Sequence, residues 1–316
     1  MTASSSSRRE TSVNANRHKG FSLAEMAVAL VIIGLLLAGA LMPISTQLEV
    51  RNTADTRRSM ELIREAIIGY AQTNGRLPCP ANGALASGAT GAGSEQWDST
   101  NSRCTTSLGV VPWGALSVPE TDAWGRRFSY RISTVFSDAI SKVTYASSTT
   151  VTPANAALVS PAAQSPGCVP TPTPALSSFA LCSLGDIAVF TRNDTTHAVS
   201  PVGSGIPAII ISHGKNGYGA FQTNGIRAAA PNDGNSDGVP DQNADEAANA
   251  TGTTTLSPAS GYTYLSYAYY NRNATPGGSG CSDSAAGSAF CEFDDIVVAI
   301  SPTTLVTRMI SAGRLP

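Results

Sequence analysis

The chain has 316 residues, six of them cysteines, and a formal net charge of −2 from 20 Lys and Arg against 22 Asp and Glu. This length allows one large domain or two small ones. Beyond residue 20 the balance is acidic, with 16 Lys and Arg against 21 Asp and Glu, which argues against a nucleic-acid-binding protein because such a protein should carry a basic patch.

Residues 1–20 form a polar, basic segment. Against one acid, Glu10, it carries the basic residues Arg8, Arg9, Arg17 and Lys19. Under the positive-inside rule we expect this end of the chain to stay in the cytoplasm and the chain after the next apolar segment to be exported. A secretory signal peptide would place its cleavage site at small residues after the apolar run. Here the change from polar, basic residues to apolar residues comes before that run, at Gly20 and Phe21.

Residues 21–43 are predicted to form a single membrane-spanning helix. No side chain from Met26 to Met42 is charged or strongly polar. With the apolar residues just before them, they reach the roughly 20 residues that a bilayer crossing needs. Glu25 lies one turn inside the N-terminal end. A carboxylate there costs about 2.5–3.5 kcal/mol on insertion scales, so we interpret it as functional and in need of a partner cation, which the helix does not contain.

The order of these features resembles the class III leader of type IV prepilins and type II secretion pseudopilins. The resemblance rests on a basic leader ending in Gly20, then Phe21, then a glutamate (Glu25) as fifth residue of the mature chain, then an uncharged run. It implies that a membrane-embedded prepilin peptidase cleaves between Gly20 and Phe21 on the cytoplasmic side. It also implies that the new amino group of Phe21 is methylated, in a single-pass inner-membrane protein with a periplasmic head.

The resemblance further implies a cation for Glu25. Cleavage exposes an ammonium on Phe21, and in a packed filament Glu25 can pair with the ammonium of a neighbouring subunit. Breaking one member of such a buried pair costs several kcal/mol, which favours subunits in register. The implied partners are other pilin or pseudopilin subunits, the prepilin peptidase and the inner-membrane assembly platform. The alternative is an ordinary single-span anchor whose Glu25 reaches the lipid headgroups.

Residues 44–75 are predicted to continue the helix in amphipathic form. Pro43 can kink a helix without ending it. The apolar positions that repeat every three or four residues, with charged residues on the other faces, are Met60, Ile63, Ile67 and Tyr70. This period predicts one buried helix face. Gly75 is expected to cap the helix, and Pro78 forbids its continuation.

Residues 76–316 are predicted to form a β-rich head. They are rich in Gly, Ser, Thr, Asn and Pro and poor in charge, which indicates short strands joined by long loops. Residues 147–178, dominated by Ser, Thr, Pro and Ala, are expected to form a surface loop. The expected strands are Phe128–Ser133, Asp186–Thr191, Ala208–Ser212, Tyr262–Tyr269 and Ile296–Ile300. The predicted fold class is α+β, with a long N-terminal helix packed against an antiparallel-sheet head, as in pilins.

A last helix is expected near the C-terminus. Ser301 is its predicted N-cap and Pro302 its first residue, and Gly313 is expected to end it. The residues predicted to share its apolar face and to pack on the head are Leu305, Val306, Met309 and Ile310.

Three elements of the head resemble parts of major pseudopilins. Asp122-Ala-Trp-Gly125 is similar to the Asp-x-Trp-Gly element that leads into their sheet. Ser212-His-Gly-Lys-Asn-Gly217 and Asp294-Asp-Ile296 resemble their Gly-rich loop and acidic strand start, where calcium is bound, although the spacing between the two elements departs from that pattern. The alternative interpretation of the latter two is turn residues and an exposed acidic strand start.

A further calcium candidate lies between those two elements. Carboxylates or amides at alternate positions around a turn at Gly238, with a backbone carbonyl at the seventh position, deliver the six to eight oxygens that calcium takes. The candidate ligands are Asp233, Asn235, Asp237, Val239, Asp241 and Asp245. The pattern is similar to EF-hand, dockerin and thrombospondin type 3 loops. It departs from them at Ala244, where Asp245 or Glu246 would have to substitute for the usual glutamate. The alternative is a solvated Asn/Asp/Gly loop.

All six cysteines lie beyond the membrane helix, which fits disulfides formed in an oxidising periplasm. Six cysteines allow 15 pairings. Loop closure favours near neighbours, so the expected pairs are Cys79 with Cys104, Cys168 with Cys182, and Cys281 with Cys291. No Cys-x-x-Cys occurs, and neither His197 nor His213 has a cysteine at zinc-finger spacing, which argues against zinc.

Catalysis has little support in the sequence. Beyond His18 in the leader only two histidines remain, and no Gly-x-Ser-x-Gly or phosphate loop occurs. The leading hypothesis is a structural subunit of a type IV pilus or type II secretion pseudopilus, and the large head suggests a minor one. The alternatives are a membrane-anchored periplasmic enzyme and a tip adhesin or ligand-binding module with a surface formed by Tyr262, Tyr264, Tyr267, Tyr269 and Tyr270.

Overall fold

The computed structural model describes residues 22–138, 179, 181, 183, 185–193, 195–228, 244–252, 262–266 and 293–315, leaving out the side chains of residues 35–46. By its internal contacts the chain forms two units, Met1–Val50 and Arg51–Pro316. No helix within these described residues is long and apolar enough to cross a membrane.

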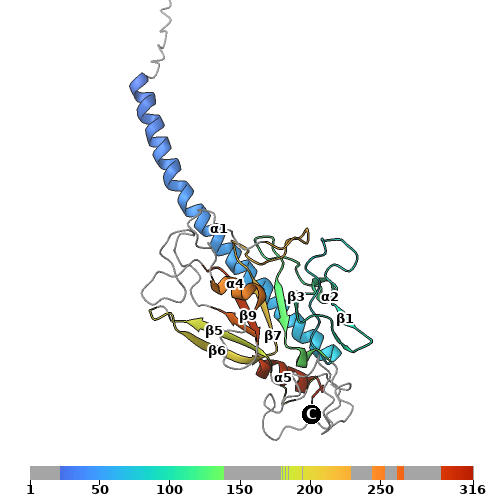
Figure 1. Ribbon diagram of the computed structural model, residues 1–316. Helices are drawn as coiled ribbons and strands as arrows, with labels where there is room; N and C mark the ends of the chain where they lie inside the picture. The colour runs from blue at the N-terminus through green and yellow to red at the C-terminus, as the bar shows by residue number, and fades with distance from the viewer. Residues whose placement is uncertain are drawn as a thin grey trace, which may run out of the picture. The chain divides into compact units, whose positions relative to one another are not determined.

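Helix α1, Leu23–Asn74, is continuous over 52 residues (Figure 1). It includes Pro43, as predicted. At 1.5 Å per residue the helix is about 80 Å long. It ends as expected at Gly75, which has φ 72° and donates its N–H to the carbonyl of Ala71. Such a left-handed residue after the last turn satisfies a helix carbonyl, and glycine adopts it without a steric penalty.

The first sheet of the head has four antiparallel strands in the order β3-β4-β7-β9. Its strands are β3 (Leu108–Val110), β4 (Ser129–Ile132), β7 (Ala208–Ser212) and β9 (Ile296–Ile300). The strands expected at β4, β7 and β9 are therefore confirmed. β3 was not predicted, because its three residues are too few to show the alternation of side chains that is typical of a strand.

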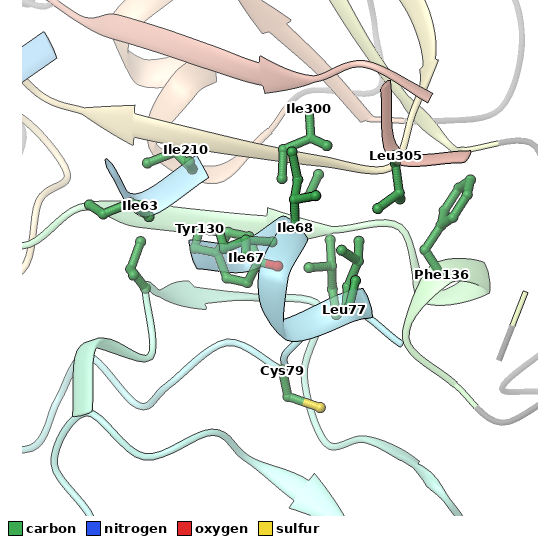
Figure 2. Packing of buried hydrophobic residues seen from close by; sticks show 14 of the residues in the cluster. Ile63, Ile67, Ile68, Leu77, Cys79, Tyr130, Phe136, Ile210, Ile300 and Leu305 are labelled. Atoms are coloured by element: carbon green, nitrogen blue, oxygen red, sulfur yellow. The ribbon is translucent and has the colours of Figure 1, made fainter. Parts of the chain in front are cut away.

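One face of this sheet packs on α1. Ile63 and Ile67 of α1 are fully buried in one cluster with Tyr130, Ile210 and Ile300 of the sheet (Figure 2). Met60 is also buried, as its spacing predicted, whereas Tyr70 remains half-buried because its hydroxyl donates to Glu95.

The opposite face of the first sheet packs on a second sheet, in the order β6-β5-β8. Its strands are β5 (Ile187–Arg192), β6 (Val199–Ile206) and β8 (Tyr262–Leu265). β5 and β6 are antiparallel, but β5 and β8 run parallel. Successive residues of a strand face opposite sides, so Ile209 and Ile211 of β7 join the core of the second sheet while Ile210 faces α1. The expected strand from Tyr262 is described only as far as Leu265.

Shorter elements complete the head. They are β1 (Trp97–Asp98), β2 (Arg103–Cys104), α2 (Trp113–Leu116), the 3-10 helix η1 (Thr134–Phe136), α4 (Ala244–Thr251) and α5 (Pro302–Ser311). α5 begins at Pro302 as predicted, and Leu305 and Met309 are buried. The prediction for Ile310 is wrong, because its side chain is 45% exposed. At 100° per residue, Ile310 lies well away from the direction of Met309.

Polar side chains interact with one another at the C-terminal end of α1. The guanidinium of Arg76 lies over the rings of Trp97 and Tyr70, with 3.9 and 5.4 Å to the ring centroids. It pairs with Glu95 at 2.8 Å, and Glu95 also accepts hydrogen bonds from the Tyr70 hydroxyl and the Cys79 N–H. Burial raises the pKa of Glu95, but these hydrogen bonds and the charge of Arg76 outweigh burial and leave the pKa below its ordinary value of 4.5.

Replacing Ile67 by Ala should lower the free energy of unfolding by about 2–5 kcal/mol, because it leaves a cavity between α1 and the sheet. Leu62→Ala is the matched control. Leu62 lies on the same helix but is 62% exposed, so its change should stay within about 0.5 kcal/mol. Urea unfolding of the detergent-solubilised chain measures both, and equal losses in the two variants would contradict the packing described.

Glu95→Gln should change the pH dependence of stability. Since the folded-state pKa of Glu95 is lowered, its carboxylate stabilises the head above the unfolded-state pKa, and this contribution is lost as pH falls through the folded-state pKa. The stability difference between the parent protein and Glu95→Gln should therefore be largest at neutral pH and shrink toward about pH 3. Urea unfolding across that range tests this, and a difference that does not vary with pH would be incompatible with it.

Candidate functional site

The N-terminus of α1 is held by a reciprocal pair of hydrogen bonds. The N–H of Ser22 donates to Oε2 of Glu25 at 2.8 Å, and the N–H of Glu25 donates to Oγ of Ser22 at 3.2 Å. This is a capping box, which satisfies two N–H groups that have no partner inside the helix. The predicted cleavage site, Gly20 and Phe21, lies outside the described residues. The capping partner of Glu25 is Ser22, the residue that follows Phe21 in the sequence.

Sequence reasoning missed the role of Ser22. The signal was available, because a serine followed three residues later by a glutamate before an apolar run is typical of a capping box. The structure thus assigns Glu25 a contact within its own chain in addition to the intersubunit pairing that the resemblance implies.

In the head, the Asp122-Ala-Trp-Gly125 element contacts the Gly-rich loop 212–217. Oδ1 of Asp122 accepts from the N–H groups of Trp124 and Arg126, each at 2.9 Å, and Oδ2 accepts from the Ser212 hydroxyl at 2.7 Å. Burial raises the pKa of Asp122, and these three hydrogen bonds oppose the shift. The element also reaches α1, because the N–H of Ala123 donates to the buried Thr56 hydroxyl.

Two glycines allow loop 212–217 to lie between its neighbours. The guanidinium of Arg126 donates to the carbonyls of Gly214 and Asn216, at 3.0 and 3.3 Å. A Cβ at Gly217 would collide with the Arg126 side chain, and one at Gly214 would collide with Asp294. Both glycines have positive φ, 70° and 54°, a region that favours glycine. The loop is thereby held against the acidic start of β9.

Three carboxylates meet at this point. Glu246 of α4 and Asp294 and Asp295 before β9 each offer an oxygen, and these oxygens lie within 4.8 Å of one another. The Asn216 amide donates to both oxygens of Glu246 at 3.0 Å, and the Asp294 N–H donates to Oε1 at 2.8 Å. We call Glu246, Asp294 and Asp295 the acidic cluster. It combines residues from the two calcium candidates of the sequence, since Glu246 comes from the segment between loop 212–217 and β9 and the two aspartates come from just before β9.

Two members of the acidic cluster are almost fully buried. Glu246 is 1% and Asp295 is 2% exposed. Burial raises the pKa of Glu246 well above its ordinary value, and the charges of Asp295 and Asp294 raise it further. Asp295 accepts from Asn249 at Oδ2, but within the described part of the chain its buried Oδ1 accepts no hydrogen bond. A site lined by carboxylate oxygens can bind either protons or a hard cation, because hard cations prefer oxygen ligands.

Asp295 also belongs to a buried row with His213 and Ser129. The Ser129 hydroxyl lies 2.9 Å from Nε2 of His213, and Nδ1 of His213 lies 3.4 Å from Oδ1 of Asp295. The order resembles a nucleophile, base and carboxylate. However, His213 is fully buried and Ser129 is 5% exposed within the sheet, so the Ser129 hydroxyl is not accessible to a substrate in this conformation. The row places the ring of His213 between Ser129 of β4 and Asp295.

The predicted calcium loop falls mostly outside the described residues, namely at Asp233, Asn235, Asp237, Val239 and Asp241. Its last predicted ligand, Asp245, lies in α4. Both carboxylate oxygens of Asp245 accept from the guanidinium of Arg192, each at 2.7 Å. Glu246, the alternative to Asp245 at that position, is the residue that reaches the acidic cluster.

One of the three expected disulfides is confirmed. Cys79 and Cys104 are joined, with Cα atoms 5.4 Å apart, and both are buried. The bond connects the chain after α1 to β2. The other predicted pairs lie outside the described residues, at Cys168, Cys182, Cys281 and Cys291.

Comparison with known proteins assigns the N-terminal segment. Residues 15–41 match the family model described as the prokaryotic N-terminal methylation motif. Neither the curated proteins nor the solved structures include a match to the chain. The matched residues contain Gly20, Phe21 and Glu25, the positions on which the resemblance was based. The N-terminus of this chain therefore carries the methylation motif that is the signature of type IV pilins and pseudopilins.

Proposed function

We propose that the chain is a pilin-like structural subunit that a prepilin peptidase cleaves between Gly20 and Phe21 and that then assembles into a type IV pilus or a type II secretion pseudopilus. The observation that carries the proposal is the match of residues 15–41 to the N-terminal methylation motif. The continuous helix α1, one side of which is buried in the head, supports it, because such a helix can present its other side to neighbouring copies.

Glu25 is the assembly residue in this proposal. The Ser22 N–H donates to its carboxylate at the start of α1, and cleavage would create an ammonium on Phe21, the residue before Ser22 in the sequence. In the filament Glu25 pairs with the ammonium of an adjacent subunit, and a subunit out of register leaves a carboxylate unpaired in an apolar environment, at a cost of several kcal/mol.

We place the subunit in the inner membrane, with its N-terminus cytoplasmic and its head periplasmic before assembly. The basic residues 1–20 followed by an apolar run support this orientation. The disulfide between Cys79 and Cys104 supports an oxidising compartment for the head. The size of the head, residues 76–316, supports a minor rather than a major subunit.

The tyrosines give little support to the alternative of a tip adhesin. Tyr264 is fully buried, and the Arg131 guanidinium lies 3.1 Å from the ring centroid of Tyr262. These are the two members of the proposed tyrosine surface that the structure describes, and they contribute to packing between the sheets.

The head is also proposed to bind calcium in a structural role. Three carboxylates packed together and largely withdrawn from water repel one another unless they gain protons or a cation. Glu246, Asp294 and Asp295 would hold the ion, with side-chain oxygens that suit calcium. Residues 233–241, which contain most of the predicted calcium ligands, come shortly before α4 in the sequence. They therefore remain candidate ligands in this proposal.

Mass spectrometry of the protein purified from its native host tests the processing step. We expect a chain that begins at N-methylated Phe21. A chain that begins at Met1, or one cleaved after residue 40, would exclude the proposed function.

Glu25→Ala tests the assembly step. We expect cleavage to persist but incorporation into filaments to fall more than about tenfold, because the loss of one intersubunit ion pair exceeds 1.4 kcal/mol. Glu25→Asp, which keeps the carboxylate, should retain more incorporation than Glu25→Ala. Quantitative immunoblotting of sheared filaments measures both, and unchanged incorporation of Glu25→Ala would refute the role of this residue.

A further inference from the structure

We propose that Arg314 and Leu315, which follow helix α5, clamp the last turn of α1 to the head, so that force applied along α1 passes into the head at this point. The mechanical role rests on the function proposed above, because copies that pack along their N-terminal helices transmit the tension of a filament through them. The contacts of the clamp all lie within the unit Arg51–Pro316.

The last turn of α1 has main-chain carbonyls that need a partner from outside the helix, because the last four carbonyls of a helix have no N–H partner within it. The Ala71 carbonyl accepts from the Gly75 N–H. The next two carbonyls, those of Gln72 and Thr73, accept from the Arg314 guanidinium, with 2.9 Å between Nε and the Gln72 oxygen. Arg314 therefore satisfies two carbonyls that the helix itself leaves without a partner.

The charge of Arg314 also suits this end of α1. The C-terminus of a helix carries a partial negative charge, which a nearby cation stabilises. The last turn, residues 71–74, contains no basic residue, and Arg76, which follows the helix, pairs with Glu95. The cation at the two carbonyls comes instead from a residue 242 positions after Gln72. A distant segment of the head thus supplies what the local sequence of α1 lacks.

Helix α5 is fastened at the same place. The side-chain amide of Gln72 donates to the carbonyl of Arg308, in the last turn of α5, at 3.2 Å. The Arg308 guanidinium also reaches Glu65 of α1 at 3.6 Å, but the two side chains are 54% and 52% exposed. An exposed ion pair of this kind contributes little. The hydrogen bonds to main-chain carbonyls, rather than this ion pair, therefore connect the ends of the two helices.

The turn after α5 directs Arg314 toward α1. Gly313 has φ 68°, a conformation that favours glycine, and the Arg314 N–H donates to the Met309 carbonyl at 2.9 Å. Leu315 is 7% exposed and belongs to the same buried cluster as Leu77, which lies just beyond the end of α1 (Figure 2). Arg314 is thus held between a closed turn on one side and a buried side chain on the other.

The clamp lies where tension acts on the weakest part of α1. The chain leaves the helix at Gly75 and is next held covalently at Cys79, by its bond to Cys104. Force along α1 therefore acts on the last helical turn, and helix ends fray. Apolar contacts have no direction, whereas hydrogen bonds weaken steeply with poor geometry. Because Arg314 donates to two adjacent carbonyls, a shift of the helix along its axis would break both contacts.

Single-molecule force measurements on the detergent-solubilised full chain test the clamp. Handles attached without cysteine chemistry, at the exposed residues Arg51 of α1 and Ile226 of the head, apply force between the helix and the head. At constant force, Arg314→Ala should detach α1 at least about tenfold faster than the parent protein, because two hydrogen bonds from a charged donor are lost. Arg314→Lys should lie between the two, since an ammonium keeps the charge but not the fork of donors.

Arg308→Ala is the matched control. It removes an exposed cation from α5 but leaves the carbonyl of residue 308 and those of α1 in place, so its detachment rate should stay within about twofold of the parent rate. A rate for Arg314→Ala equal to that of the parent protein, or an equal acceleration in Arg314→Ala and Arg308→Ala, would overturn the clamp.

Hydrogen exchange without force separates a clamp from a general effect on the head. In Arg314→Ala we expect faster exchange at residues 75–77 and unchanged exchange in β5 and β8. A loss of protection throughout the second sheet would mean that Arg314 stabilises the whole head, and the inference would be wrong. A mature chain that begins at Met1 would instead remove the filament, and with it the mechanical role, without changing the result of the force measurement.

Discussion

The fold of the head depends on covering one face of helix α1. Met60, Ile63, Ile67 and Ala71 recur at three- and four-residue spacing and are all fully buried. An apolar stripe of this kind must be removed from water, and the antiparallel sheet β3-β4-β7-β9 does so with Tyr130, Ile210 and Ile300. Because the strands alternate their side chains, the same sheet presents Ile209 and Ile211 to the second sheet. Two cores therefore share the strands of one sheet.

The loops of the head are held by buried polar groups rather than by apolar packing. Arg127 is fully buried. Its guanidinium pairs with Glu120 at 2.7 Å and donates to the carbonyls of Gly83, Leu85 and Thr223, which belong to two segments far apart in sequence. A buried charge is tolerated only when it is paired and its donors are used, and Arg127 meets that condition. Asp122 performs a similar task for loop 212–217.

The two regions for which we propose a function use acidic side chains in different ways. Glu25 lies exposed at the start of α1, where a capping box satisfies its carboxylate within its own chain. The acidic cluster lies inside the head, where Glu246 and Asp295 are shielded from water. The buried carboxylates of the acidic cluster create a demand for protons or a positive partner, whereas Glu25 would need one only when it is buried in the proposed filament. The proposed partner is a neighbouring subunit in one case and a cation in the other.

Local sequence patterns determined the elements whose signals are local. The apolar run and the helical period predicted α1 with its end at Gly75, short segments between loop-forming residues predicted the strands at β4, β7 and β9, and the leader pattern predicted the methylation motif. Each of these patterns lies within one short segment, so it can be recognised without knowing which other segments pack against it. The pairing of Cys79 with Cys104 could also be predicted, because a short loop costs little entropy to close.

Only the tertiary structure decided how distant segments meet. Glu246 is 48 residues before Asp294, and Asp245 and Glu246 are adjacent in sequence although one binds Arg192 and the other joins the acidic cluster. Sequence spacing cannot distinguish these two carboxylates, since the choice depends on the direction in which each side chain leaves α4 and on where β5 and β9 lie around it. The same holds for the parallel pairing of β5 with β8. Long-range packing, which follows from burying both faces of one sheet, sets these contacts.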